Sequence, residues 1–146
     1  MTPLAMLIRD LSVPHGKLAL AWLGGAGFVL KPSAGPVVAI DPYLSDSIDQ
    51  FYSWKRLPLS PIPIAPAELQ AGLVLTTHAH EDHLDPHTIP DVVSSSDALV
   101  AGPASCVELM GQWGVPGDRI IRVNSGERQT LRGVDVHAVF AHHAGQ

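Results

Sequence analysis

The feature that most constrains this chain is an apolar run that ends abruptly in a cluster of histidines. The run Leu73–Thr77 is followed directly by His78–His83, whose order is His-Ala-His-Glu-Asp-His. A short apolar run is typical of a buried strand, and the loop after such a strand lies at a sheet edge, where binding residues are common. Imidazole and carboxylate are usual ligands of zinc and related divalent ions. We therefore predict a metal site in this loop, against the alternative of a solvated polar loop.

The spacing divides the candidate ligands into two pairs. His78 and His80 are two residues apart, so in extended geometry they point the same way and can hold one ion. Asp82 and His83 follow where we expect a turn, because Asp85-Pro86 resembles a helix N-cap and a first helical residue. That turn would direct the second pair at a second position. Two ions about 3.5–4 Å apart can hold a bridging hydroxide and stabilise attacking and leaving oxygens.

The His-x-His-x-Asp-His stretch after an apolar strand resembles the signature of the metallo-β-lactamase superfamily. Other segments are similar to one branch of it, the L-ascorbate-6-phosphate lactonase-like hydrolases. The similarity extends from Leu18 to His143. The resemblance implies an α/β fold, the first half of a four-layer αββα sandwich with the metals between its two sheets. The segments that carry the branch resemblance are Ala21–Lys31, Ile40–Asp46, Gly102–Leu109 and Trp113–Pro116.

The resemblance also implies that residues 1–146 form a single domain that is truncated at its C-terminus. Family members continue with a Gly-Asp segment, whose Asp bridges the two metals, and later with another ligand His. We therefore expect a fragment or truncated product, or a chain completed by another chain, with a possible homo-oligomer through the incomplete sandwich face. An apolar content of 46% fits a chain buried on more than one side, although a small apolar α/β domain would show it equally.

Two further site residues follow from the resemblance. Related proteins carry a third histidine on the first metal after a strand that corresponds to Val134–Val139. The alignment favours His143, with His142 as the choice after a one-residue slip and an exposed polar chain end as the alternative. Asp41 is placed near the metals, where a carboxylate can accept the second N–H of a ligand histidine. An ordinary turn-forming Asp before Pro42 would explain the same residue.

The resemblance implies a metal-dependent hydrolase with one or two divalent ions, zinc or manganese. Such ions lower the pKa of a bound water towards about 7 and supply hydroxide, which Asp82 is expected to orient as the catalytic residue. For a lactonase-like enzyme the implied substrate is a cyclic ester of a sugar acid. The alternatives are a phosphodiesterase of the same fold and a non-catalytic or inactive metal-binding half-domain.

Charge and composition narrow the partners. A net charge of −5 with only nine Lys plus Arg argues against a nucleic-acid surface, which needs clustered positive charge. The single cysteine, Cys106, cannot form an internal disulfide, and we expect a buried structural thiol rather than a nucleophile. The apolar stretch Leu4–Ile8 is too short for a secretory signal or a membrane span. We expect a cytoplasmic protein with a small-molecule substrate and neither a nucleic acid nor a membrane as partner.

Strands that alternate with helices favour an α/β sheet. The segment Asp41–Pro66 reads as a long irregular excursion, whose aromatic residues Phe51, Tyr52 and Trp54 would wall a substrate pocket or pack on themselves. Further strands are predicted over Lys17–Leu23, Phe28–Lys31, Val37–Ile40, Ala98–Ala101, Ile120–Val123 and Val134–Val139, and helices over Asp85–Val93, interrupted near Pro90, and Pro103–Gln112.

Overall fold

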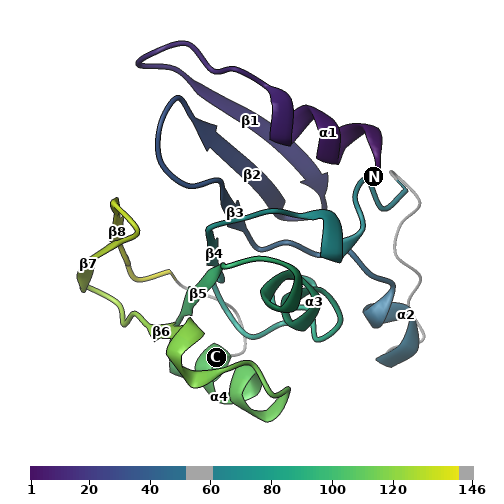
Figure 1. Ribbon diagram of the computed structural model, residues 1–146. Coiled ribbons are helices and arrows are strands. Elements are labelled where there is room, and N and C mark those ends of the chain that lie inside the picture. The colour runs from purple at the N-terminus through teal and green to yellow at the C-terminus, as the bar shows by residue number, and fades with distance from the viewer. Residues whose placement is uncertain (52–60, 142–146) are drawn as a thin grey trace.

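A computed structural model describes residues 1–51 and 61–141, in which a six-stranded sheet is the central element (Figure 1). The strands lie side by side in chain order. The pairs β1–β2 and β2–β3 are antiparallel, whereas the pairs from β3 to β6 are parallel. The strands are β1 (Leu18–Gly24), β2 (Gly27–Pro32), β3 (Val38–Ile40), β4 (Leu73–Leu75), β5 (Leu99–Gly102) and β6 (Ile120–Arg122).

Six helical segments and a separate hairpin complete the described part of the chain. The hairpin consists of β7 (Arg128–Leu131) and β8 (Val134–His137), which pair as a second, two-stranded antiparallel sheet. None of the helices in the described residues is long and apolar enough to cross a membrane. The helices are α1 (Pro3–Asp10), α2 (Ser47–Phe51), α3 (Thr88–Ser95) and α4 (Ala104–Gln112), with short 3-10 helices η1 (Pro66–Glu68) and η2 (Gly117–Arg119).

The parallel strands bury apolar side chains on both faces of the sheet. In β4, Val74 packs into one core cluster, whereas Leu73 and Leu75 pack into a second one. The same alternation holds for β3 and β5, where Ala39 and Val100 join the first cluster and their strand neighbours join the second. Successive side chains of a strand point to opposite faces, so the two clusters lie on opposite sides of the sheet. The apolar run therefore forms a strand buried on both sides, as predicted.

The helices α1, α3 and α4 cover the face that carries the first cluster (Figure 1). Thr2 explains where α1 begins, because its Oγ1 accepts a hydrogen bond from Ala5 N at 3.3 Å and Pro3 occupies the first turn. Lys31 of β2 explains how α1 is held at its end. Its Nζ donates to the carbonyl oxygens of Ile8 and Arg9, at 2.5 and 2.8 Å.

The opposite face is covered only in part, by the β7–β8 hairpin. The hairpin turns at Arg132 and Gly133, which both have positive φ, the backbone form that a two-residue hairpin requires. Its side chains pack against β3 to β6, and β1 extends beyond them. On β1, Leu18, Leu20 and Trp22 are 57%, 63% and 53% exposed, and all three point to this face because they alternate along the strand.

The structure corrects several sequence predictions. The helix predicted over Asp85–Val93 begins at Thr88 as α3, because Asp85 instead starts a turn that leads into it. Pro90 does not interrupt α3, since it lies in the first turn, where a missing N–H leaves no intrahelical bond unmade. The strand predicted to reach Val139 ends at His137. The excursion Asp41–Pro66 contains the short helix α2, and its residues Tyr52 and Trp54 lie outside the described residues.

Gly102 ends β5 where no other side chain fits. A Cβ there would overlap Thr76 Oγ1 and lie 3.1 Å from Cys106 Cβ, both in the buried interior. We expect Gly102→Ala to lower the free energy of unfolding by about 1–3 kcal/mol, measured by urea denaturation. Gly111→Ala in α4 is the control, because that Cβ meets nothing within 4 Å and alanine favours a helix. Equal stability of the two variants would contradict this packing.

The exposed apolar residues of β1 carry a second prediction. We propose that the 146-residue chain, expressed by itself, associates with a second copy through this face, since large exposed apolar patches mark interaction surfaces. Analytical ultracentrifugation should show a dimer or larger species that Leu20→Ser/Trp22→Ser converts to monomer. Leu7→Ser is the control, because Leu7 is also 57% exposed but lies on α1, which covers the other face of the sheet. A wild-type monomer at all concentrations, or a dimer unaffected by the double substitution, would refute the proposal.

Candidate metal centre

The histidine loop leaves the carboxyl end of β4 and turns at once. Thr76 N bonds to Ala101 O at 2.8 Å, which extends the strand pairing by one residue. His80 O then accepts bonds from His83 N at 2.9 Å and from Leu84 N at 2.7 Å, which closes a single turn. Leu84 is 1% exposed and anchors the loop in the core. The predicted turn therefore exists, and it returns His83 to the start of the loop.

This turn brings the three imidazoles together. The ring centroids of His78 and His83 are 4.0 Å apart, and those of His78 and His80 are 4.7 Å apart. The ring nitrogens His78 Nε2 and His80 Nδ1 face each other at 3.2 Å. Two nitrogen ligands at about 2.0–2.1 Å from one tetrahedral zinc ion are separated by about 3.3–3.4 Å. The two nitrogens are joined by a hydrogen bond, and their separation is close to that of two ligands of one ion.

The second pair lies beside the first. His83 Nε2 is 3.6 Å from Asp82 Oδ2, and the Asp82 side chain is 50% exposed, so solvent reaches it. The division into His78/His80 and Asp82/His83 stays a prediction, because the ring of His83 also lies 4.0 Å from that of His78, centroid to centroid. Imidazole nitrogens beside a carboxylate fit a divalent ion such as zinc in their chemistry.

Asp41 holds His83, one residue of the second pair, by a hydrogen bond. Its carboxylate is buried, 3% exposed, and accepts hydrogen bonds from His83 Nδ1 at 2.8 Å, Thr77 N at 2.8 Å and Thr77 Oγ1 at 2.7 Å. Its φ of 44° lies in the left-handed region, which non-glycine residues rarely adopt outside special sites. The contact with His83 is the one that a carboxylate supporting a ligand histidine makes. Its role toward a metal stays a prediction.

The described residues do not complete either coordination sphere. Within residues 1–51 and 61–141, no three His, Cys, Asp or Glu side chains are grouped so that they could hold one ion. The donors instead form two pairs, each of which needs further ligands. His143 and its alternative His142 lie outside the described residues, so the predicted third ligand of the first ion stays a prediction.

Sequence reasoning missed Thr77. Its hydroxyl contacts Asp41 Oδ2 at 2.7 Å, His78 Nδ1 at 3.0 Å and His83 Nδ1 at 3.5 Å. The available signal was a hydroxyl residue directly before the first histidine, at the end of a strand. Threonine is favoured in strands in any case, so this signal could not separate a polar contact from ordinary strand composition.

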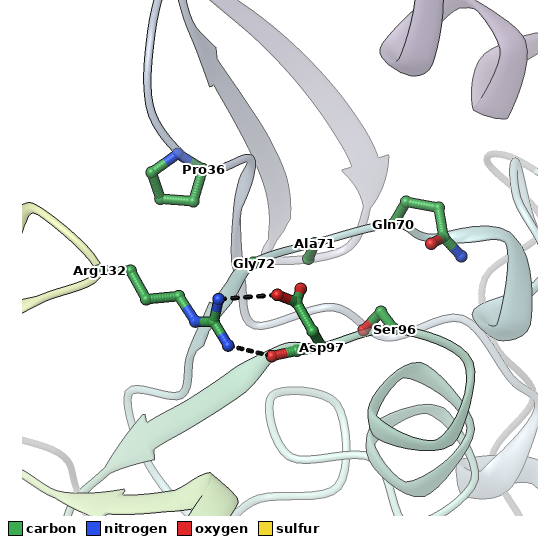
Figure 2. A pocket seen from close by; sticks show the side chains of 7 residues that line it. All are labelled: Pro36, Gln70, Ala71, Gly72, Ser96, Asp97 and Arg132. Carbon is green, nitrogen blue, oxygen red and sulfur yellow. Dashed lines mark hydrogen bonds and ion pairs between the residues drawn. The ribbon is translucent and has the colours of Figure 1, made fainter.

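A hollow of about 450 Å³ lies at the other edge of the sheet (Figure 2). Its residues precede β3, β4 and β5 or belong to the β7–β8 turn, whereas the histidine loop follows the carboxyl end of β4. In Figure 2 the Arg132 guanidinium reaches across to Asp97, with Nη1 at 2.8 Å from Oδ2. This ion pair fastens the β7–β8 turn to the start of β5. The hollow is therefore separate from the candidate metal centre.

Several known proteins are similar to this chain in sequence. A family model described as "Beta-lactamase superfamily domain" matches residues 19–146. The "Probable L-ascorbate-6-phosphate lactonase UlaG" of Escherichia coli O127:H6 (strain E2348/69 / EPEC) is 29% identical over 155 residues, covering 92% of this chain and 44% of the relative. The protein of the same name from Shigella boydii serotype 18 (strain CDC 3083-94 / BS512) gives the same figures. The chain thus spans less than half the length of these curated relatives.

A solved structure shares the fold. A mutant of the CmlA beta-hydroxylase superposes with a TM-score of 0.59 at 20% sequence identity, over 87% of this chain and 25% of that chain. At this identity the likeness shows the fold alone.

Cys106 lies in α4 and is buried, as the sequence predicts. It is fully buried, and burial raises the pKa of its thiol, more than the Thr76 side chain lowers it. A raised pKa leaves less thiolate at any given pH. We expect the native protein to react with a maleimide at pH 8 at least about tenfold more slowly than the urea-unfolded chain. Equal rates would show that the thiol is exposed and activated.

Proposed function

The chain belongs to the beta-lactamase superfamily, and on this premise we propose that it is a metal-dependent hydrolase. The family agrees with the resemblance of the histidine loop and with the predicted partial αββα fold. The observation that carries the proposal is the pairing of His78 Nε2 with His80 Nδ1 at 3.2 Å, beside the Asp82/His83 pair. The substrate class that we propose is a cyclic ester of a sugar acid. The name of the relatives, a probable L-ascorbate-6-phosphate lactonase, supports that class.

The four candidate ligands of the loop have distinct roles in this proposal. His78 and His80 would hold one ion, and Asp82 and His83 a second. Zinc or manganese bound there would make a bound water acidic and polarise the ester carbonyl. Asp82 is half-exposed, so it can accept a hydrogen bond from the attacking water and orient it towards the carbonyl carbon. Attack forms the new C–O bond and breaks the ring C–O bond, whose oxygen takes up a proton.

In this proposal Asp41 orients a ligand histidine and does not itself bind the ion. Its buried carboxylate holds the Nδ1 side of His83, so the Nε2 side faces Asp82. A ligand that is already oriented loses less conformational freedom when it binds an ion. This support would orient His83 before an ion binds.

A second function from another class is favoured by one observation. The described residues supply two ligand pairs and no group of three. A non-catalytic metal-binding half-domain is consistent with this. The two functions differ in whether metal loading is accompanied by hydrolysis.

Metal content tests the proposal first. We expect one or two equivalents of zinc or manganese per purified chain by plasma mass spectrometry, and a loss of at least about tenfold in affinity for His80→Ala, which removes a direct ligand. His15→Ala is the matched control, because His15 is exposed outside the loop. Equal metal content in His80→Ala and wild type would contradict the ligand assignment.

Hydrolysis is measured on the same samples. Metal-loaded wild type should open sugar-acid lactones, and Asp82→Ala should lose this activity by about 100-fold or more while remaining folded. Phosphodiesters are assayed in parallel, and turnover of these alone would replace the proposed substrate class. Full metal loading without turnover of either would favour the half-domain.

A further inference from the structure

Thr77 lies between the two ligand pairs and contacts both. Its backbone N donates to Asp41 Oδ1 at 2.8 Å, and its Oγ1 donates to Asp41 Oδ2 at 2.7 Å. The same Oγ1 is 3.0 Å from His78 Nδ1, which belongs to the first pair. Asp41 Oδ2 is 2.8 Å from His83 Nδ1, which belongs to the second pair. One hydroxyl and one carboxylate therefore connect His78 to His83.

The directions of these hydrogen bonds follow from the groups involved. A hydroxyl has one hydrogen, and a carboxylate can only accept, so the Thr77 hydrogen points to Asp41. Toward His78 the hydroxyl oxygen can then only accept, so Nδ1 of His78 carries the ring hydrogen. The carboxylate likewise requires a hydrogen on Nδ1 of His83. Nε2 of both rings then carries no hydrogen, so His78 Nε2 accepts from His80 Nδ1 at 3.2 Å, and His83 Nε2 faces Asp82 Oδ2 at 3.6 Å.

We infer that Thr77 is a positioning residue that fixes the tautomer of His78 and couples the two ligand pairs through Asp41. The alternative tautomer would place a hydrogen on His78 Nε2, directly toward His80 Nδ1, and that nitrogen could not bind an ion. Without this contact, the hydrogen bond between His78 Nε2 and His80 Nδ1 could form with the hydrogen on either nitrogen. The tautomer part of the inference is independent of metal, whereas the coupling part rests on the proposed function.

Two substitutions separate the hydroxyl from the rest of the side chain. Thr77→Val keeps the branched shape and removes the hydroxyl, whereas Thr77→Ser keeps the hydroxyl and removes a methyl group. Because Thr77 is exposed, the valine should leave the two core clusters unchanged. Thermal unfolding of each variant checks this, because a shift in Thr77→Val alone reports the lost hydroxyl and a shift in Thr77→Ser alone reports the lost methyl group.

Long-range ¹H–¹⁵N correlation NMR of the metal-free chain decides the inference. His78 and His83 should both carry hydrogen on Nδ1 in wild type and in Thr77→Ser. In Thr77→Val, His78 should shift towards the Nε2–H form, while His83 keeps its bond to Asp41. A His78 that carries hydrogen on Nε2 in wild type, or that is the same in wild type and Thr77→Val, would overturn the inference.

Zinc titration by calorimetry gives the second readout. We expect binding to Thr77→Val to be about 10–100-fold weaker than to wild type, and binding to Thr77→Ser to stay within about threefold. Zinc binding that is unchanged in Thr77→Val would overturn the coupling. A wild-type chain that binds no zinc would refute the proposed function instead, and the NMR result would still decide the role of Thr77.

Discussion

The carboxylate of Asp41 joins the end of β3 to the end of β4, and the histidine loop takes its shape from this junction. Asp41 N bonds to Leu75 O at 2.9 Å, so the strand pairing continues one residue beyond β3. The chain then turns with a positive φ, and the side chain accepts three hydrogen bonds from Thr77 and His83. A buried carboxylate without hydrogen-bond partners costs folding free energy. These hydrogen bonds therefore hold Asp41 in place, and Asp41 in turn holds Thr77 and His83.

The two-sided burial of the parallel strands fixes the register of this junction. β3, β4 and β5 are only three or four residues long, and each contributes side chains to both core clusters. A one-residue slip of β4 would exchange Val74 with its neighbours and move His78 to the wrong face. The apolar run therefore does two things at once. It builds the core and sets the position at which the first histidine emerges.

Much of this arrangement can be predicted from sequence, because periodicity and spacing are local. Alternation within short apolar runs predicts the strands, and the two-residue spacing of His78 and His80 predicts their pairing. The helix α1 went unassigned, although the N-cap Thr2 before Pro3 was a usable signal. β7 was missed because its residues Arg-Gln-Thr-Leu are largely polar, and only pairing with β8 shows it to be a strand. The contact of Asp41 with His83 joins residues 42 positions apart, which spacing cannot reveal.

The hydrogen bonds around the histidine loop would lower the entropy cost of binding an ion at the proposed site. Ordering a free side chain costs up to about 2 kcal/mol of conformational entropy, and a metal site must order each of its ligands. Here the turn at His80, the buried Leu84 and the Asp41 carboxylate place His83, and Thr77 contacts His78. His78 and His83 are thus each held by hydrogen bonds. In the proposed metal site, ordering these two side chains would therefore cost less conformational entropy than ordering free ones.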